Sequence, residues 1–315
     1  MALGGATLAL SSRWGRILPG AAVPAATAIV VIAVAGVALL VALDTLIPMK
    51  RVLWGGTIVA CAPAAGANCR GVDFRINLRD TDFAGADLRQ TSLVNVDLSR
   101  ATLEGADLRG ADLRLAILEG ANLRRARLEG AVLVQARLSQ ASLIGAEMTR
   151  ARFALASLEN ADLSSANLAW ANINSTIFNR ANMMGIRPTG ASMTGANFVG
   201  TNLSQATIAG VLQGGANFNQ SSVAGANLAG VGINGMNFSQ ADMTKANLRG
   251  ANMTGTNVMG ATLQGTDLTA ADLANIDLTR RVPATRSSET TRRTAARAVL
   301  RDPHQLNSRY RNTDR

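Results

Sequence analysis

The chain has 315 residues and a formal net charge of +10, with one histidine and two cysteines. So few histidines and cysteines exclude a disulfide-rich scaffold and a Cys/His metal cluster, and the sequence offers no Ser–His pair and no glycine-rich phosphate loop. The positive charge lies at the two ends, because residues 72–281 carry 18 basic and 17 acidic side chains, so charge gives no reason to expect nucleic acid on the body of the protein.

The N-terminal region is predicted to comprise a flank over residues 1–16, a transmembrane α-helix over 17–47 and a linker over 48–66. Residues 17–43 carry no charge, and residues 21–43 are nearly all Ala, Val, Leu and Ile. As a helix this apolar stretch would be about 34 Å long, which is enough for a bilayer core. A single pass through a bacterial inner membrane is therefore the predicted localisation, and the nearby Lys and Arg residues slightly favour a solenoid on the cytoplasmic side.

Three other interpretations of residues 1–48 stay open. A cleaved signal peptide would have an unusually long apolar stretch and no clear small-x-small cleavage site before Asp44. The sequence Ile58-Val59-Ala60-Cys61 resembles a lipoprotein box, which would require translation to begin at Met49. The third alternative is a buried helix of a soluble protein.

An apolar residue recurs at every fifth position from Leu78 to Leu278, which makes 41 consecutive centres. Of these centres, 39 are Leu, Phe, Met, Ile or Val, and 27 have Ala two residues earlier. A five-residue period fits neither a helix, at about 3.6 residues per turn, nor an ordinary strand, at about 2. Residues 67–281 are therefore predicted to form a repeat solenoid in which the centre and the preceding small residue point inward.

The phenylalanines indicate how many repeats close one coil. Four of them are 20 residues apart, and 20 residues are four repeats. A four-sided coil would stack their rings in one column, so the fold predicted is an all-β solenoid, a quadrilateral β-helix of about ten coils. The inward residues predicted for the structural core include Leu88, Leu108, Leu128, Phe178, Phe198, Phe218 and Phe238.

The tandem pattern Ala-[Asp/Asn]-[Leu/Phe/Met]-x-x resembles the signature of the pentapeptide-repeat proteins, and it covers about 200 of the 315 residues. This resemblance implies a right-handed quadrilateral β-helix. It implies little about activity, because the family is functionally diverse. Some relatives protect topoisomerases by mimicking DNA, which requires an acidic face, and a body with nearly balanced charge argues against that function here.

The repeat is irregular at three places. Pro188 and Gln213 occupy centres; proline cannot donate to a hydrogen-bond ladder, and a buried glutamine needs partners. A bulge or loop is predicted at each, either as a tolerated defect or as a local distortion that serves as a docking site. Phe74 and Leu78 are four residues apart instead of five, which predicts an irregular first coil or cap over residues 67–77.

Stacking at 20 residues also predicts which charged side chains meet on neighbouring coils. The favourable pairs are Asp107 with Arg127, Arg127 with Glu147, Arg109 with Glu129, Glu104 with Arg124, and Asp80 with Arg100. The unfavourable pairs are Asp87 with Asp107 and Arg89 with Arg109.

The C-terminal segment 282–315 is rich in Arg, Ser and Thr and has no core pattern. Residues 288–300 are predicted to form a short helix. Two interpretations stay open: a capping helix with a disordered tail, or a basic arm for anionic lipid or nucleic acid.

No residue is a candidate for catalysis, cofactor binding or metal binding, and the chain is predicted not to be an enzyme. The function predicted is a membrane-anchored scaffold for protein interaction. The alternatives are lipid or nucleic-acid binding through the basic tail and, ranked lower, topoisomerase protection. The predicted partners are the membrane, an unidentified protein and a second copy through the solenoid end, and no small-molecule substrate is evident.

Overall fold

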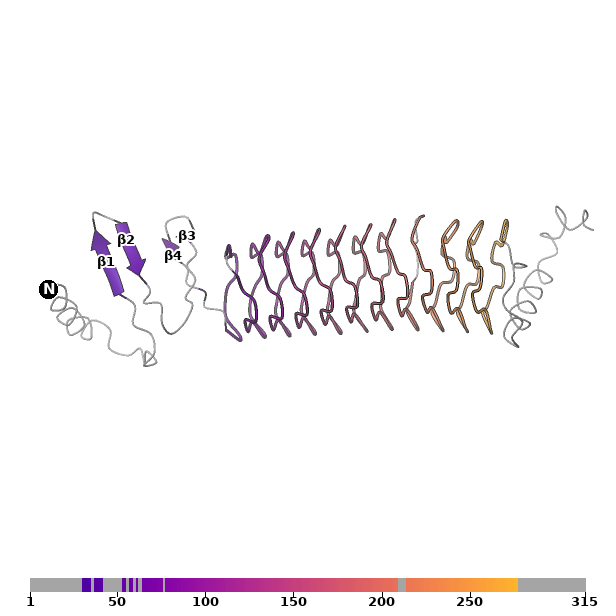
Figure 1. Cartoon of the computed structure of the whole chain (residues 1–315), viewed down its shortest axis with the longest axis horizontal. Helices are drawn as coiled ribbons and strands as arrows, with labels where there is room; N and C mark the ends of the chain where they lie inside the picture. Colours follow the sequence, from indigo (N-terminus) through magenta and orange to yellow (C-terminus); the bar gives the residue numbers. More distant parts are fainter. Residues whose placement is uncertain are drawn as a thin grey trace, which may run out of the picture. The chain divides into compact units, whose positions relative to one another are not determined.

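The computed structural model divides the chain into two compact units, Met1–Met49 and Lys50–Arg315, each of which is described by itself (Figure 1). The structure describes residues 30–34, 37–41, 53–54, 57–58, 61, 64–75, 77–208 and 214–276. The predicted flank 1–16, the predicted tail 282–315 and Gln213 lie outside these residues.

The N-terminal unit contains a β-hairpin where the sequence predicts a transmembrane helix. Strand β1 (Val30–Val34) pairs with the antiparallel β2 (Val37–Val41) in a register that sets Val30 opposite Val41. The prediction of a helix over 17–47 is therefore wrong for these residues. Branched side chains such as valine favour a pleated strand, and an apolar run alone does not distinguish strands from a helix. In the part of the chain that is described, no helix is both long and apolar enough to cross a bilayer.

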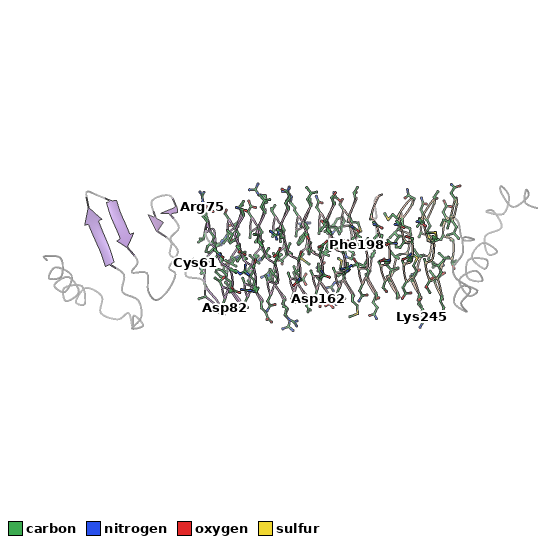
Figure 2. The ribbon with its side chains drawn as sticks, viewed as in Figure 1. Cys61, Arg75, Asp82, Asp162, Phe198 and Lys245 are labelled. Carbon is green, nitrogen blue, oxygen red and sulfur yellow. A yellow bond between two sulfur atoms is a disulfide. The ribbon has the colours of Figure 1, made fainter. Side chains whose placement is uncertain are left out.

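The second unit begins with a short antiparallel pair and a disulfide. Strand β3 (Leu53–Trp54) pairs with β4 (Thr57–Ile58). Cys61 is then bonded to Cys69; both are buried, and their Cα atoms are 5.3 Å apart (Figure 2). That separation lies in the usual range for disulfides. A Cys61 sulfur bonded to Cys69 cannot also carry a lipid, so the disulfide and the lipoprotein-box alternative exclude each other.

Each repeat of the solenoid is a short extended segment followed by a tight turn. The carbonyl of the buried centre Leu103 accepts a hydrogen bond from the N–H of Ala106 at 3.0 Å. Between them Gly105 has a φ of +65°, the left-handed conformation that the third residue of a type II turn requires. The outward Asp or Asn before a centre closes an Asx turn, as Asp82 does by accepting from the N–H of Ala84 at 2.9 Å.

Successive coils pair in parallel at a spacing of 20 residues, and the coils lie one after another along an axis (Figure 1). The N–H of Leu128, for example, donates to the carbonyl of Glu147 at 2.7 Å. Because bridged residues are four repeats apart on every face, the coil has four sides, as the phenylalanine spacing predicts. The first bridges join Asn68 to Asp87 and Asp73 to Ser92, which are 19 residues apart, so the first coil is one residue short, in agreement with its predicted irregularity.

The core consists of columns of inward side chains. Phe198 stacks between Phe178 and Phe218 with ring-centroid separations of 5.1 and 4.7 Å, and Phe238 continues the column at 4.6 Å. A buried Thr176 at a small inward position donates its hydroxyl to the carbonyl of Phe153 at 2.8 Å, so this polar group stays bonded. The residues predicted for the core are all buried: Leu88, Leu108, Leu128, Phe178, Phe198, Phe218 and Phe238.

Pro188 does not produce the predicted bulge or loop. The turn pattern continues through it, and the proline ring is buried at its centre position. The chain accommodates the ring by losing one ladder contact. Bridges join Asn167 to Arg187 and Thr207 to Asn227, whereas no bridge joins the described residues Arg187 and Thr207. The proline nitrogen has no hydrogen to donate there, but its fixed φ is compatible with extended backbone.

Candidate interaction surface

The outward side chains of the first coils pair within single repeats. The two residues that flank a buried centre lie on the same face, since side chains alternate along an extended segment. Arg89 donates to both carboxylate oxygens of Asp87 at 2.8 and 2.6 Å, and Arg109 holds Asp107 in the same way. An Asp-x-Arg repeat therefore forms a bidentate ion pair.

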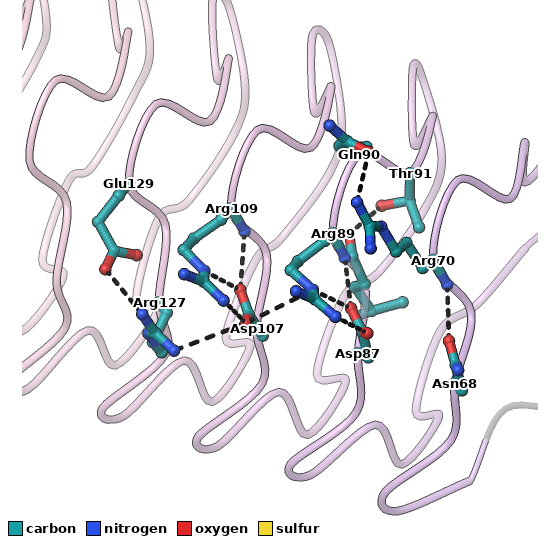
Figure 3. A network of polar contacts seen from close by, with 11 residues as sticks. Asn68, Arg70, Asp87, Arg89, Gln90, Thr91, Asp107, Arg109, Arg127 and Glu129 are labelled. Atoms are coloured by element: carbon teal, nitrogen blue, oxygen red, sulfur yellow. Dashed lines mark hydrogen bonds and ion pairs between the residues drawn. The ribbon is translucent and has the colours of Figure 1, made fainter.

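These pairs join along one face into a charge ladder, which consists of Asp87, Arg89, Asp107, Arg109, Arg127 and Glu129 (Figure 3). The Nε of Arg89 lies 3.8 Å from Asp107, and a guanidinium nitrogen of Arg127 lies 3.7 Å from the same carboxylate. Arginine therefore stands between successive aspartates. The predicted repulsion between Asp87 and Asp107 is offset by this alternation, which stacking at 20 residues alone does not reveal.

The predicted charge pairs are confirmed for Asp107 with Arg127 and for Asp80 with Arg100, whose closest nitrogen–oxygen distance is 2.6 Å. The other three pairs are not among the ion pairs of the described residues, because closer partners compete. Arg109 binds Asp107 in its own repeat. Glu104 and Glu147 accept hydrogen bonds from Asn122 and Asn167 at 3.2 and 2.8 Å.

The ladder also changes how its carboxylates titrate. Hydrogen bonds from Arg89 lower the pKa of Asp87 to about 2, and hydrogen bonds from Arg109 lower the pKa of Asp107. An unpaired aspartate titrates near about 3.9. The contribution of Asp87 to stability is therefore complete above that pH and is lost as the pH falls toward about 2.

Replacing Asp87 by asparagine is expected to reduce the acid sensitivity of the solenoid. Because both partners are partly exposed, the loss at neutral pH is expected to stay below about 1 kcal/mol. Thermal melting between about pH 2 and pH 5 compares Asp87→Asn with Asp242→Asn, a carboxylate that forms no ion pair within the described residues. Equal acid slopes for wild type and Asp87→Asn would show that the ladder does not set the acid response.

The later coils have a different surface, in which amide side chains bond to one another along the axis. Asn237 donates to Asn217 at 3.1 Å, and Asn257 donates to Asn237 at 3.2 Å. These asparagines lie outside the column of stacked phenylalanines. Their hydrogen-bonding groups are used within the solenoid, so this surface is regular, polar and nearly uncharged.

The surface between these two regions carries the most exposed large apolar side chains of the described residues. Trp170 is 64% exposed and Leu155 is 58% exposed. Trp170 occupies a turn position with a φ of +60°, and its indole lies over Gly190 in the next coil. A Cβ at Gly190 would come within 2.6 Å of the ring, so only glycine leaves room for the indole in this position.

Arginines without an ion-pair partner in the described part of the chain lie on the coils next to this tryptophan. The N–H of Arg150 donates to the carbonyl of Ala169, next to Trp170, at 2.9 Å, so Arg150 precedes Trp170 by one coil. Arg187 lies on the following coil, bridged to Asn167, and Arg152 lies on the adjoining face, bridged to Asn172. We call Trp170, Arg150, Arg152 and Arg187 the tryptophan platform.

The site residues predicted from the sequence do not include the tryptophan platform. The predicted core residues are buried and serve packing, and Pro188 is buried as well, so its side chain is not available for docking. The platform was missed because it has no catalytic or metal-binding motif. A signal was present, since Trp170 stands at a turn position that is glycine in most coils of its column: Gly110, Gly130, Gly190, Gly230 and Gly250.

Comparison with known proteins agrees with this geometry. The family model described as pentapeptide repeats matches eight copies, over residues 76–114, 116–154, 151–187, 178–210, 214–258 and 241–280. The chain belongs to the pentapeptide-repeat family. This pentapeptide-repeat protein matches no curated protein. The right-handed sense of its β-helix stays a prediction that rests on the family resemblance.

Several solved structures of pentapeptide-repeat proteins are similar to the chain. HetL, involved in heterocyst differentiation regulation in the cyanobacterium Nostoc sp. strain PCC 7120, is 29% identical; the match covers 66% of this chain and 89% of HetL, with a TM-score of 0.43. A protein of the Arabidopsis thaliana thylakoid lumen is 26% identical over 41% of this chain and 82% of its own, with a TM-score of 0.21. QnrB1, a plasmid-mediated fluoroquinolone resistance protein, is 17% identical over 72% and 96%, with a TM-score of 0.31.

Proposed function

We propose that this pentapeptide-repeat protein is a non-enzymatic rod that binds a protein partner along its side. The observation that carries the proposal is the continuous register of the coils. Bridges at 20-residue spacing lead from coil to coil from Asp82 to Asp272, and among described partners in that range only Arg187 and Thr207, next to Pro188, are not bridged. A rod of about ten coils would be roughly 50 Å long at about 4.8 Å per coil.

The stacked coils hold the outward side chains at fixed intervals in the unbound protein. Preorganised side chains lose little conformational entropy on binding, which raises affinity without adding contacts. The exposed Trp170 and Leu155 are held in this way, at turn positions of fixed backbone conformation. Exposed tryptophan and arginine are also the residues in which interface binding energy is most often concentrated.

The charge ladder weighs against the alternative of DNA mimicry. A mimic of phosphates presents carboxylates to its partner, whereas Asp87 and Asp107 are bound by arginines of their own repeats. We expect the full-length chain at micromolar concentration not to inhibit supercoiling by gyrase. Inhibition in that assay would favour the mimic over the interaction rod.

Affinity capture from extracts of the native cells tests the proposal, with the full chain, the Leu128→Arg variant and a chain lacking residues 282–315. The proposal predicts a stoichiometric protein partner on the full chain and on the tail-deleted chain, and its loss from Leu128→Arg. A partner held only by the tail would instead support binding through the basic arm, as would lipid or DNA binding that disappears with the tail. Fractionation with protease protection on the same cells tests the predicted membrane localisation.

A further inference from the structure

Trp170 destabilises the fold, or fails to stabilise it, in two ways. A non-glycine residue at a φ of +60° is destabilising relative to glycine by about 1 kcal/mol, and the exposed indole gains little from burial. Glycine fills most equivalent turns of the same column. The fold itself therefore does not require tryptophan here, and what sets Trp170 apart from the other non-glycine residues at such turns is its large, exposed indole.

The indole is also held in one place. Three of its ring atoms lie 2.6–2.9 Å from where a Cβ of Gly190 would be, so the ring rests directly on the backbone of the next coil. Its outer face stays open to solvent, as the 64% exposure shows. A flat apolar surface with a fixed orientation is thereby presented along the side of the rod.

The arginines place positive charge on the coils next to the indole. Arg150 and Arg187 lie on the coils before and after Trp170, and Arg152 lies on the adjoining face. None of the three forms an ion pair within the described residues, in contrast to the arginines of the charge ladder. The nearest acid along the column, Glu147, accepts a hydrogen bond from Asn167 at 2.8 Å.

We propose that the tryptophan platform is the docking site for an acidic segment of a protein partner. An apolar or aromatic side chain of that segment would pack on the indole, and flanking carboxylates would bind the arginines, whose planar guanidinium groups match carboxylates in a bidentate manner. This inference rests on the proposed function and names the chemistry of its partner.

Charge complementarity selects an acidic protein segment over other occupants. A second copy related by a two-fold axis would bring the same positive platform against itself. A long polyanion such as DNA would follow the rod and meet Glu129, Glu147 and Glu159 on nearby coils. The three arginines lie on the coils before and after that of Trp170, within roughly 10 Å along the axis, which suits a short acidic segment better than a run of phosphates.

Binding of a fluorescent glutamate-rich peptide with one central phenylalanine to the full chain tests the proposal. Trp170→Gly is expected to weaken binding at least about ten-fold while the melting temperature stays equal or rises, because glycine relieves the turn. Gly190→Ala keeps the tryptophan but displaces its ring, and is expected to weaken binding as well. Arg150→Gln with Arg152→Gln should lower affinity and its salt dependence.

Arg180→Gln is the matched control, since Arg180 is also an exposed turn arginine without an ion pair in the described region but lies on another corner. It should leave binding unchanged. Equal affinity of wild type and Trp170→Gly would overturn the proposal, as would single-stranded DNA or phosphatidylglycerol vesicles binding the platform in place of the peptide. If the partner captured by wild type is still captured by Trp170→Gly, the platform is wrong and the interaction rod stands. If no partner is captured at all, the proposed function itself fails.

Discussion

Replacing Leu128 by arginine is expected to break the solenoid. Leu128 is fully buried, and its N–H is already committed to the carbonyl of Glu147 on the next coil. An inward arginine loses the leucine's burial and places an unpaired charge in the core, a combined cost expected to exceed about 5 kcal/mol. Since each coil contacts only its neighbours, the damage should separate the rod into two poorly stabilised parts.

Circular dichroism melting with limited proteolysis measures this effect. Wild type should melt as one cooperative rod, and Leu128→Arg should be cleaved near the substitution or fail to melt cooperatively. Arg89→Ala is the control, because Arg89 points outward and its ion pairs with Asp87 and Asp107 are partly exposed, which limits the loss to about 1 kcal/mol. Equal shifts in melting temperature for the two variants would show that inward and outward positions are wrongly assigned.

Replacing Phe198 by alanine is expected to have the second largest effect. The ring is buried between Phe178 and Phe218, and its removal leaves a cavity inside a stacked column. Such truncations destabilise by about 3–5 kcal/mol, because the surrounding structure collapses only in part. The neighbouring coils should weaken with it, since their rings lose a stacking partner.

Denaturant unfolding compares Phe198→Ala with Phe198→Leu and Phe153→Ala. Leucine occupies most centres of the repeat, so Phe198→Leu is expected to cost less than about 1.5 kcal/mol. Phe153 is equally buried but lies outside the stacked column, so the excess loss in Phe198→Ala measures the stacking, expected at about 0.5–1.5 kcal/mol. If alanine at position 198 costs no more than alanine at position 153, stacking in the ring column does not stabilise the rod.

The regular part of the fold could be predicted from the sequence because every coil repeats the same requirement. A centre that recurs every fifth residue and rings that recur every twentieth fix both the inward positions and the four sides. Pro188 shows the limit of the argument. Proline lacks the N–H, but the bridges on the coils before and after it stay in place, so the ladder absorbs one lost contact without forming a loop, which the identity of a single residue does not reveal.

The N-terminal hairpin and the disulfide could not be predicted in this way. Residues 30–41 have the composition of a membrane helix and of buried strands alike, and an apolar run of this kind does not by itself separate the two. Cys61 and Cys69 come together through the path of the chain into the first coil, which lies outside the repeat frame.

The only surface contacts predicted from the sequence are charge pairs between residues 20 apart. The Asp-x-Arg pairs depend on two side chains of one repeat leaning together, and they compete with the stacking neighbours. The tryptophan platform depends on the contact of Trp170 with Gly190, a pair 20 residues apart in which neither residue is charged or at a centre, so neither the charge pattern nor the centre pattern predicts it. Predictions from charged residues and repeat centres therefore miss uncharged surface contacts of the rod.

Pulsed electron-spin distance measurements between paired nitroxide labels test the four-sided coil most directly. The labels are placed on one face, at Asp82 with Asp162 and at Asp82 with Asn202, which are connected by four and six successive bridges. The two native cysteines are joined to each other, so the introduced cysteines are the labelled thiols. At about 4.8 Å per coil, the separations should be about 19 and 29 Å and should scale with the number of coils. Separations that do not grow in this proportion would contradict a coil closed by four repeats.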